Sequence, residues 1–169
     1  MISSGTLHVI ATELTIGMFA LSGVAFLLCL LKKGPLSREA VAHWALLGGL
    51  LATPFAIFTG LNAAPGEGIE NPLLANKLLL STASTGLAIG ILIRRKWGGD
   101  VDSRHASIGM ISVALMLTTA GMGGEYSRNE TLLFLIPKET VFLFPIWASI
   151  LLIVLGVVML GKSAVEHRR

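Results

Sequence analysis

Charged residues are scarce in this 169-residue chain, and that scarcity excludes an ordinary water-soluble domain. Asp, Glu, Lys and Arg make up 14% of the sequence, whereas soluble domains carry about 25%. Hydrophobic residues make up 53%, and the mean hydropathy is +0.77. The formal net charge of +3 comes from basic residues that lie between apolar runs. They form no separate basic face or tail, so nucleic acid is not an expected partner.

Cysteine and the common catalytic motifs are also nearly absent. Cys29 is the single cysteine, so no internal disulfide can form, and its place in an apolar run predicts a small buried side chain. The sequence contains no P-loop, G-x-S-x-G, H-E-x-x-H or C-x-x-C-H motif. This argues against a self-contained hydrolase or a nucleotide-driven pump. We expect no catalytic activity of the chain's own, although the sequence leaves that question open.

What the sequence has instead is five long apolar runs. They cover roughly residues 6–31, 39–61, 72–93, 105–123 and 140–161. The length of each run is close to that of a transmembrane helix, which needs about 20 residues. None of the runs alternates polar and apolar residues as a barrel strand does. The first run is longer than the apolar core of a secretory signal, which has about 7–15 residues, so we expect it to be retained. We therefore predict an all-α integral membrane protein with five transmembrane helices in a single domain, residues 1–169.

The loops between these runs differ in charge, and the difference predicts the orientation. One set of loops carries most of the basic residues, namely Lys32, Lys33, Arg38, Arg94, Arg95, Lys96, Arg104, Lys162, Arg168 and Arg169. The opposite set is richer in glutamate. Cytoplasmic loops carry an excess of Lys and Arg. The N-terminus is therefore predicted to lie outside and the C-terminus in the cytoplasm.

A weak internal repeat runs through the first four predicted helices. Lys32 and Arg94 each end an apolar run, and His43 and His105 each follow eleven residues later. Two related hairpins predict a four-helix up-and-down bundle with one added C-terminal helix. In such a bundle the second and fourth helices run the same way and sit diagonally. Both histidines are then expected at similar depth in the cytoplasmic half.

A histidine pair of this kind suggests a haem site. His43 and His105 are the candidate axial ligands of a b-type haem iron. Arg38, Arg95 and Arg104 lie in the basic loops and are candidate partners for the haem propionates. The alternative is that both histidines are interfacial and hydrogen-bond only to the loops, with no cofactor bound.

A second group of polar residues lies toward the outer ends of the runs. His8 and Glu13 belong to the first run and Lys77 to the third, and an ionisable group within a span is a candidate functional residue. We expect an intramembrane cluster in which a buried Glu13–Lys77 ion pair fixes the helix packing. The alternatives are a carboxylate that carries protons or binds quinol, or part of a metal site shared with the end of the fourth run.

Three short segments carry a family resemblance. Leu7-His8 lies early in the first helix, Thr59-Gly60 at the exit of the second, and Ala120-Gly121-Met122-Gly123-Gly124-Glu125-Tyr126 at the exit of the fourth. In these segments the chain resembles a family of small polytopic membrane proteins of bacteria and archaea whose function is unknown. The resemblance implies a four-helix core, an association with haem or redox chemistry, and the plasma (inner) membrane of a prokaryote.

The chain departs from that family at one position. The family pattern implies a histidine near the start of the third helix, where this chain has Asn76-Lys77. An outer haem ligated through His8 is therefore not expected, which leaves His43 and His105 as the better haem ligands.

These observations predict a small membrane redox or electron-transfer subunit within a larger complex, with haem b as its candidate cofactor. The alternative is a cofactor-free accessory subunit whose apolar faces pack against larger membrane subunits. A quinone- or pigment-binding subunit is a third interpretation. The expected partners are the lipid bilayer, larger membrane subunits and, on the third interpretation, quinone.

Overall fold

The computed structural model describes residues 3–63, 70–96, 100–129, 136–137 and 140–166, and these ranges contain five α-helices and no strand. The helices are α1 (Ser4–Leu30), α2 (Ser37–Ala63), α3 (Pro72–Lys96), α4 (Ser103–Arg128) and α5 (Ile146–Glu166). The predicted all-α class is confirmed for this part of the chain.

Local signals explain where these helices begin and end. Ser3 caps α1 by accepting a hydrogen bond from Thr6 N, and Asp102 caps α4 by accepting one from His105 N. Both are side-chain oxygens that satisfy free N–H groups of a first turn. At the other end of α4, Asn129 takes a left-handed conformation with φ 57°, a common way to end a helix.

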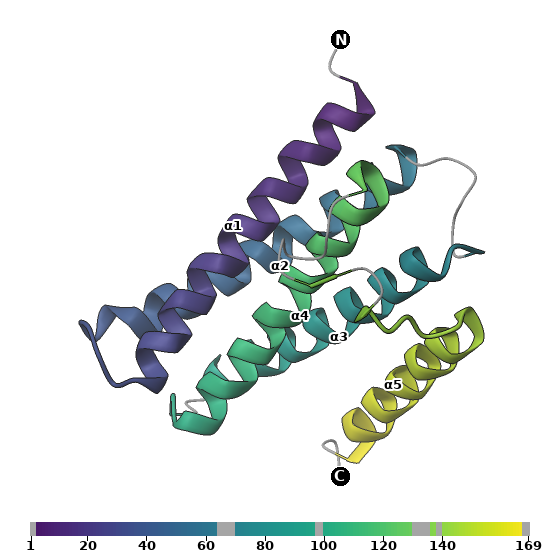
Figure 1. The fold of residues 1–169 in the computed structure, drawn as a ribbon. Helices are drawn as coiled ribbons and strands as arrows, with labels where there is room; N and C mark the ends of the chain where they lie inside the picture. The colour runs from purple at the N-terminus through teal and green to yellow at the C-terminus, as the bar shows by residue number, and fades with distance from the viewer. Residues whose placement is uncertain (1–2, 64–69, 97–99, 130–135, 138–139, 167–169) are drawn as a thin grey trace.

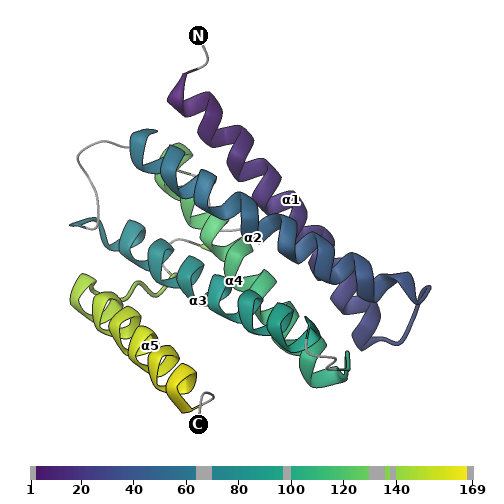
Figure 2. The same cartoon turned by 180° about the vertical axis from the view of Figure 1, so that it is seen from behind.

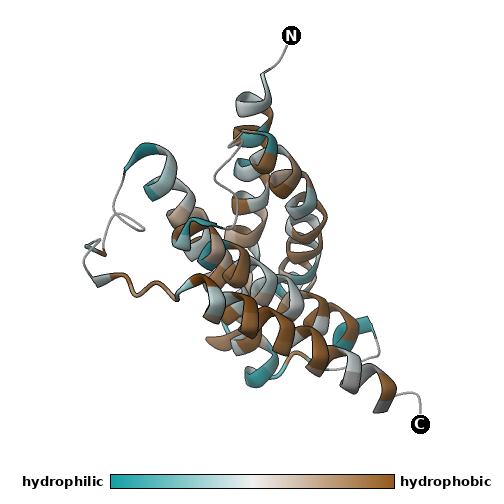
Figure 3. Ribbon diagram, turned by 90° about the vertical axis from the view of Figure 1, so that its right-hand side faces the viewer, coloured by the Kyte–Doolittle hydropathy of each residue, from teal (hydrophilic) through white to brown (hydrophobic). Residues whose placement is uncertain are grey.

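Four of the five helices are long and apolar enough to cross a membrane, namely α1 to α4. The apolar part of α5, Ile146–Gly161, is shorter than the about 20 residues that a span needs. Figure 3 shows that it is nonetheless almost wholly hydrophobic. The prediction of a transmembrane helical bundle is thus supported for four spans, whereas a fifth is not established.

The predicted fifth run starts too early because of Pro145. We expected the run from residue 140, but α5 begins at Ile146, directly after the proline. The carbonyl of Pro145 accepts the N–H groups of Ala148 and Ser149. Proline thus lies at the start of this helix, where its missing N–H has no cost.

The first four helices form one bundle, and α5 lies to its side (Figures 1 and 2). The most extensive contacts are between α1 and α2, followed by α3 with α4 and α1 with α4, whereas α2 and α3 touch little and α5 packs on α3. We call the end with the α1–α2 and α3–α4 connections the inner end and the opposite end the outer end, after the predicted orientation.

Glycines let the helices of this bundle approach closely. A Cβ added at Gly23 would lie 2.8 Å from Val113, and one at Gly109 would lie 2.6 Å from the ring of Phe26. Small residues are what bring helices together in lipid, where no hydrophobic force acts between them. Gly86 and Gly90 of α3, in contrast, have no atom within 4 Å of an added Cβ.

Asn76 holds the segment before α5 against α3. Its amide donates to Phe144 O at 2.7 Å, and its Oδ1 accepts from Phe144 N at 2.9 Å. Asn76 is only 2% exposed, so this two-point contact gives a buried amide the partners it needs. Asn76 therefore has a structural role in this chain.

Candidate functional site

His43 and His105 meet inside the bundle near its inner end. Their Nε2 atoms lie 2.9 Å apart, and their ring centroids are 5.1 Å apart with the planes inclined at 44°. The side chains come from α2 and α4 and are 8% and 1% exposed. The structure thus brings together the two residues that the sequence repeat singled out, and both are buried among the helices.

The helices around the pair are tied together by buried hydroxyl groups. Ser22 Oγ on α1 donates to Ala42 O on α2 at 2.8 Å, one residue before His43. Ser84 and Ser112 each donate to the other's carbonyl, at 2.7 and 2.9 Å, and so join α3 to α4. These contacts fix the backbones that carry the two imidazoles.

The hydrogen bonds of the pair specify how each ring is protonated when both are neutral. His43 Nδ1 lies 2.6 Å from the carbonyl oxygen of Glu39, which can only accept, so the proton of neutral His43 is on Nδ1. His43 Nε2 is then an acceptor, and His105 Nε2–H must donate to it. This leaves His105 Nδ1 as a lone-pair acceptor, and that atom is buried and has no partner among the described residues.

An aromatic side chain that the sequence did not indicate packs against both imidazoles. Phe26 on α1 is fully buried, and its ring centroid lies 5.5 Å from that of His43 and 6.2 Å from that of His105. It also packs on Gly109 of α4. An apolar run gives no sign of which of its phenylalanines will face a histidine, so no sequence signal was available.

The site has suitable donor atoms for a haem, but the space between the two imidazoles is too narrow for the macrocycle. Two imidazole nitrogens that share one metal ion lie about 4 Å apart if each bond is about 2 Å, so the two rings would have to separate by roughly 1 Å. A macrocycle between them would also displace Phe26. His43 has the second-sphere hydrogen bond of a metal-ligating histidine, because its Nδ1–H donates to a backbone carbonyl and its Nε2 lone pair points to the neighbouring imidazole.

The arginines that we predicted as propionate partners have other partners here. Arg38 donates to the carbonyls of Lys33 and Gly34 at 2.8 and 2.7 Å and so closes the α1–α2 connection. Arg95 lies 3.4 Å from the carboxylate of Glu39. Arg104 is exposed. Arg38 and Arg95 therefore have contacts of their own, and the prediction did not include Glu39, which Arg95 contacts.

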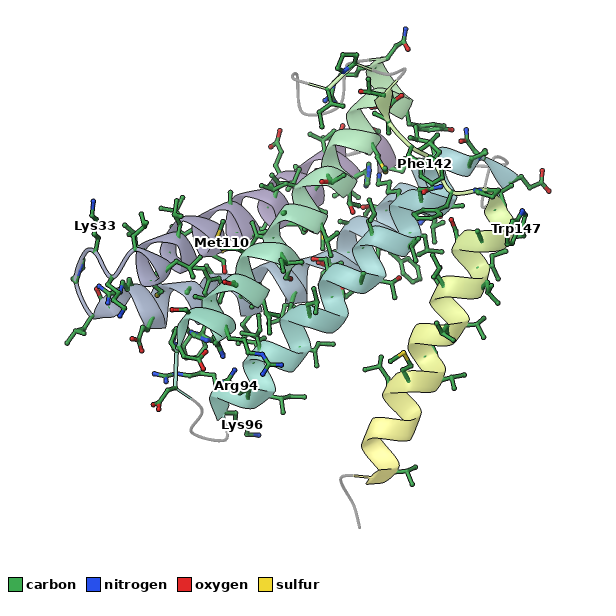
Figure 4. The ribbon with its side chains drawn as sticks, turned by 60° about the horizontal axis from the view of Figure 1, so that its bottom comes forward. Lys33, Arg94, Lys96, Met110, Phe142 and Trp147 are labelled. Atoms are coloured by element: carbon green, nitrogen blue, oxygen red, sulfur yellow. The ribbon has the colours of Figure 1, made fainter. Side chains whose placement is uncertain are left out.

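The neighbouring Arg94 pairs with a carboxylate in the same way. It lies at the inner end of α3 (Figure 4) and contacts Asp102 at 3.0 Å. Asp102 in turn caps α4 just before His105. The backbone N–H of His105 and the guanidinium of Arg94 hold the pKa of the Asp102 carboxyl below its usual range. An aspartate directly before an apolar helix is a recognisable cap signal, and it was available in the sequence.

A cavity of about 380 Å³ opens at the inner end. It is lined by Cys29, Lys32, Arg38, Glu39, Val101, Asp102 and Ser103. The backbone carbonyl of Glu39 accepts a hydrogen bond from His43, and the side chain of Asp102 accepts one from the backbone N–H of His105. The cavity therefore lies next to the histidine pair and mixes basic with acidic side chains.

The predicted outer cluster is only partly assembled. His8 Nδ1 lies 3.2 Å from Thr59 Oγ1 on α2, and Lys77 lies against Gly123 on α4. Glu13 is exposed on the outside of α1, and it forms no ion pair with Lys77 in the part of the chain that the structure describes. The expected Glu13–Lys77 pair is therefore not formed, because the carboxylate faces away from the bundle.

The described residues also contain no group of three or more His, Cys, Asp or Glu side chains that could hold a metal ion. Comparisons with protein-family models, with curated proteins and with solved structures found no match.

Proposed function

We propose that this chain is a small integral membrane electron-transfer subunit that holds a b-type haem between His43 and His105. The observation that carries the proposal is the approach of two Nε2 atoms to 2.9 Å from different helices in a buried site. Two imidazole nitrogens that face each other inside an apolar bundle are a suitable donor set for haem iron. We also propose that the chain lies in the plasma membrane of a prokaryote and belongs to a larger redox complex.

Each residue of the pair has a distinct task in this proposal. His43 is held for binding by Glu39 O, which fixes both its ring and its protonation. His105 has to move its proton from Nε2 to Nδ1 before its Nε2 can bind a metal. When bound, haem supplies one-electron chemistry at a potential that its ligands and its burial set.

The room for the macrocycle has to come from the small residues around the pair. Ala42 and Ala106 are fully buried, and they are adjacent in sequence to His43 and His105 respectively. Phe26 is the bulky side chain that must turn aside. The propionates would be held by basic side chains of the inner end, where Lys32 and Arg38 line the cavity, Arg95 lies in the last turn of α3 and Arg104 in the first turn of α4.

A reduced-minus-oxidised spectrum of the purified full-length protein tests the proposal. We expect the α-band of a b-type haem, in a ratio of one haem to one chain after reconstitution. His43→Ala and His105→Ala should each remove the bis-histidine spectrum, whereas His8→Ala should leave it unchanged. Absence of the band in protein reconstituted with haem, with correct helicity by circular dichroism, would overturn the proposal.

A cofactor-free accessory subunit is the second candidate, and two observations favour it. The imidazoles already satisfy each other, and Phe26 fills the space beside them. Glu13 is exposed on the outside of α1, whereas ionisable groups within spans usually face protein. Purification in mild detergent distinguishes this candidate, because a stoichiometric larger subunit that is lost on Glu13→Leu, without any haem band, would support it.

A further inference from the structure

Lys77 places an ammonium group inside the outer end of the bundle. It is the sixth residue of α3, about 7–8 Å along the helix axis from Pro72 at 1.5 Å per residue. Its Nζ would lie 3.0 Å from a Cβ added at Gly123, and its Cε 3.7 Å from it. The end of the side chain therefore lies against the backbone of α4 at Gly123.

This ammonium has no counter-charge among the described residues. The ion pairs found there, Arg94–Asp102 and Arg95–Glu39, are both at the inner end. Glu13 faces out of the bundle. Glu125 follows Gly123 by two residues, so it projects about 200° further round α4, away from the side that Lys77 touches.

The second nitrogen base at this end does not neutralise Lys77. His8 Nδ1 contacts Thr59 Oγ1, whose own proton goes to Phe55 O at 2.7 Å. The His8 proton is therefore on Nδ1 in the neutral ring. Lys77 lies near enough for its charge to interact electrostatically with this imidazole. One turn deeper on α1, Thr12 Oγ1 is buried with no partner.

The arrangement selects the chemistry of a ligand. A partly buried charge without a partner is costly, and a neutral acceptor such as a quinone carbonyl would leave that charge uncompensated. An anion removes the cost directly. A phosphate or carboxylate group also offers further oxygens to other hydrogen-bond donors.

We propose that Lys77 is the centre of a binding site for a single oxyanion group at the outer end of the bundle, with His8 near it. The oxyanion could reach the site as a soluble ion or as the headgroup phosphate of an anionic lipid. The site is independent of the histidine pair and of any haem bound there.

Thermal unfolding of the purified full-length protein tests the site. Inorganic phosphate at constant ionic strength is titrated against the protein in a lipid-free detergent, and phosphatidylglycerol is compared with phosphatidylcholine in nanodiscs. A ligand that binds only the folded state raises Tm with its concentration. We expect such a rise with phosphate if the ion is soluble, and with phosphatidylglycerol alone if the source is lipid.

Three variants separate an anion site from a purely structural lysine. Lys77→Met should abolish the rise and, in the absence of the anion, should leave Tm equal to or above that of the wild type, because a buried charge is gone. Lys77→Arg should retain the response. Lys96→Met removes the same charge from the exposed end of α3 and should respond as wild type. The proposal is overturned if the Lys77→Met protein responds like the wild type, or if neither phosphate nor phosphatidylglycerol changes the Tm of the wild type.

Discussion

The two ends of the bundle differ in how their charged side chains are paired. His43 and His105 share a hydrogen bond, and Arg94 and Arg95 each contact a carboxylate. At the outer end Lys77 has no counter-charge among the described residues. Buried polar atoms without a partner among those residues occur at both ends, namely Thr12 Oγ1 and Glu125 Oε2 at the outer end and His105 Nδ1 and Arg38 Nε at the inner end. The same four helices thus form both ends, yet within the part of the chain that the structure describes the ion pairs lie only at the inner one.

The difference follows from what packs between the helices at each end. The inner end is filled by Phe26, which touches both imidazoles and Gly109. At the outer end the equivalent glycine of α4, Gly123, is covered by the flexible end of Lys77. A close-packed ring holds its neighbours in one arrangement, whereas a lysine side chain can shift to admit another group. The inner end is therefore suited to rigid positioning and the outer end to adaptation.

The largest expected effect concerns the unequal roles of the two histidines. His43 has a second hydrogen bond to Glu39 O, and His105 Nδ1 has none. Such outer partners are worth about 10–100-fold in metal affinity. We expect His43→Ala to weaken haem binding at least about tenfold more than His105→Ala, which should retain a five-coordinate haem. Titration of the apoprotein with haem, followed by optical spectroscopy, measures both affinities.

The same asymmetry can be tested without haem. In the cofactor-free protein, nitrogen-15 NMR should show neutral His43 protonated on Nδ1 and His105 on Nε2. His8→Ala is the matched control at the outer end and should alter neither signal. Equal losses of affinity in the two alanine variants, or a His43 ring protonated on Nε2, would contradict the distinction.

A smaller effect is expected from adding one methyl group at each end. In Gly109→Ala the new Cβ would lie 2.6 Å from the fully buried ring of Phe26, and such overpacking costs about 1–3 kcal/mol. In Gly123→Ala the new Cβ meets only Lys77, chiefly its Nζ, which can move. Alanine favours a helix over glycine by about 1 kcal/mol, so this variant should be neutral or stabilised.

Thermal unfolding midpoints of the two alanine variants, measured in one detergent, give the comparison. Gly90→Ala provides the reference for helix propensity alone, since nothing lies within 4 Å of its added Cβ. If Gly123→Ala were as damaging as Gly109→Ala, the outer end would be as tightly packed as the inner end, and the contrast between them would fail.

The sequence predicts the helices of this fold well because long apolar runs and their caps are local signals. It also identifies His43 and His105, because the repeat places both at one depth. It could not place Glu13, since a helix that is apolar all round gives no preferred inward face. Nor could it pair Arg95 with Glu39 or Asn76 with Phe144, because these contacts join residues that are 56 and 68 positions apart and depend on how the helices pack.

The smallest expected effect distinguishes the helix caps of the two ends by their response to acid. At the inner end α4 is capped by Asp102, whose pKa is lowered by the His105 N–H and by Arg94. At the outer end Asn71 Oδ1 accepts from Leu73 N at 2.9 Å, and an amide does not titrate. Because the folded-state pKa of Asp102 is below its unfolded value of about 4, its stabilisation is present above that pH and is lost as the pH falls through the folded pKa.

Asp102→Asn should therefore lower Tm slightly at neutral pH, where Arg94 loses its partner, and should flatten the fall in Tm below a pH of about 4. Asparagine remains a good cap, so the helix itself is kept and the difference reports the charge alone. Asp100→Asn removes an exposed carboxylate two residues earlier and should follow the wild-type profile. Identical acid profiles for the wild type and the Asp102→Asn protein would mean that the charge on this cap contributes nothing. The inner end would then owe its order to buried packing around Phe26 and the histidine pair, and not to the carboxylates that surround them.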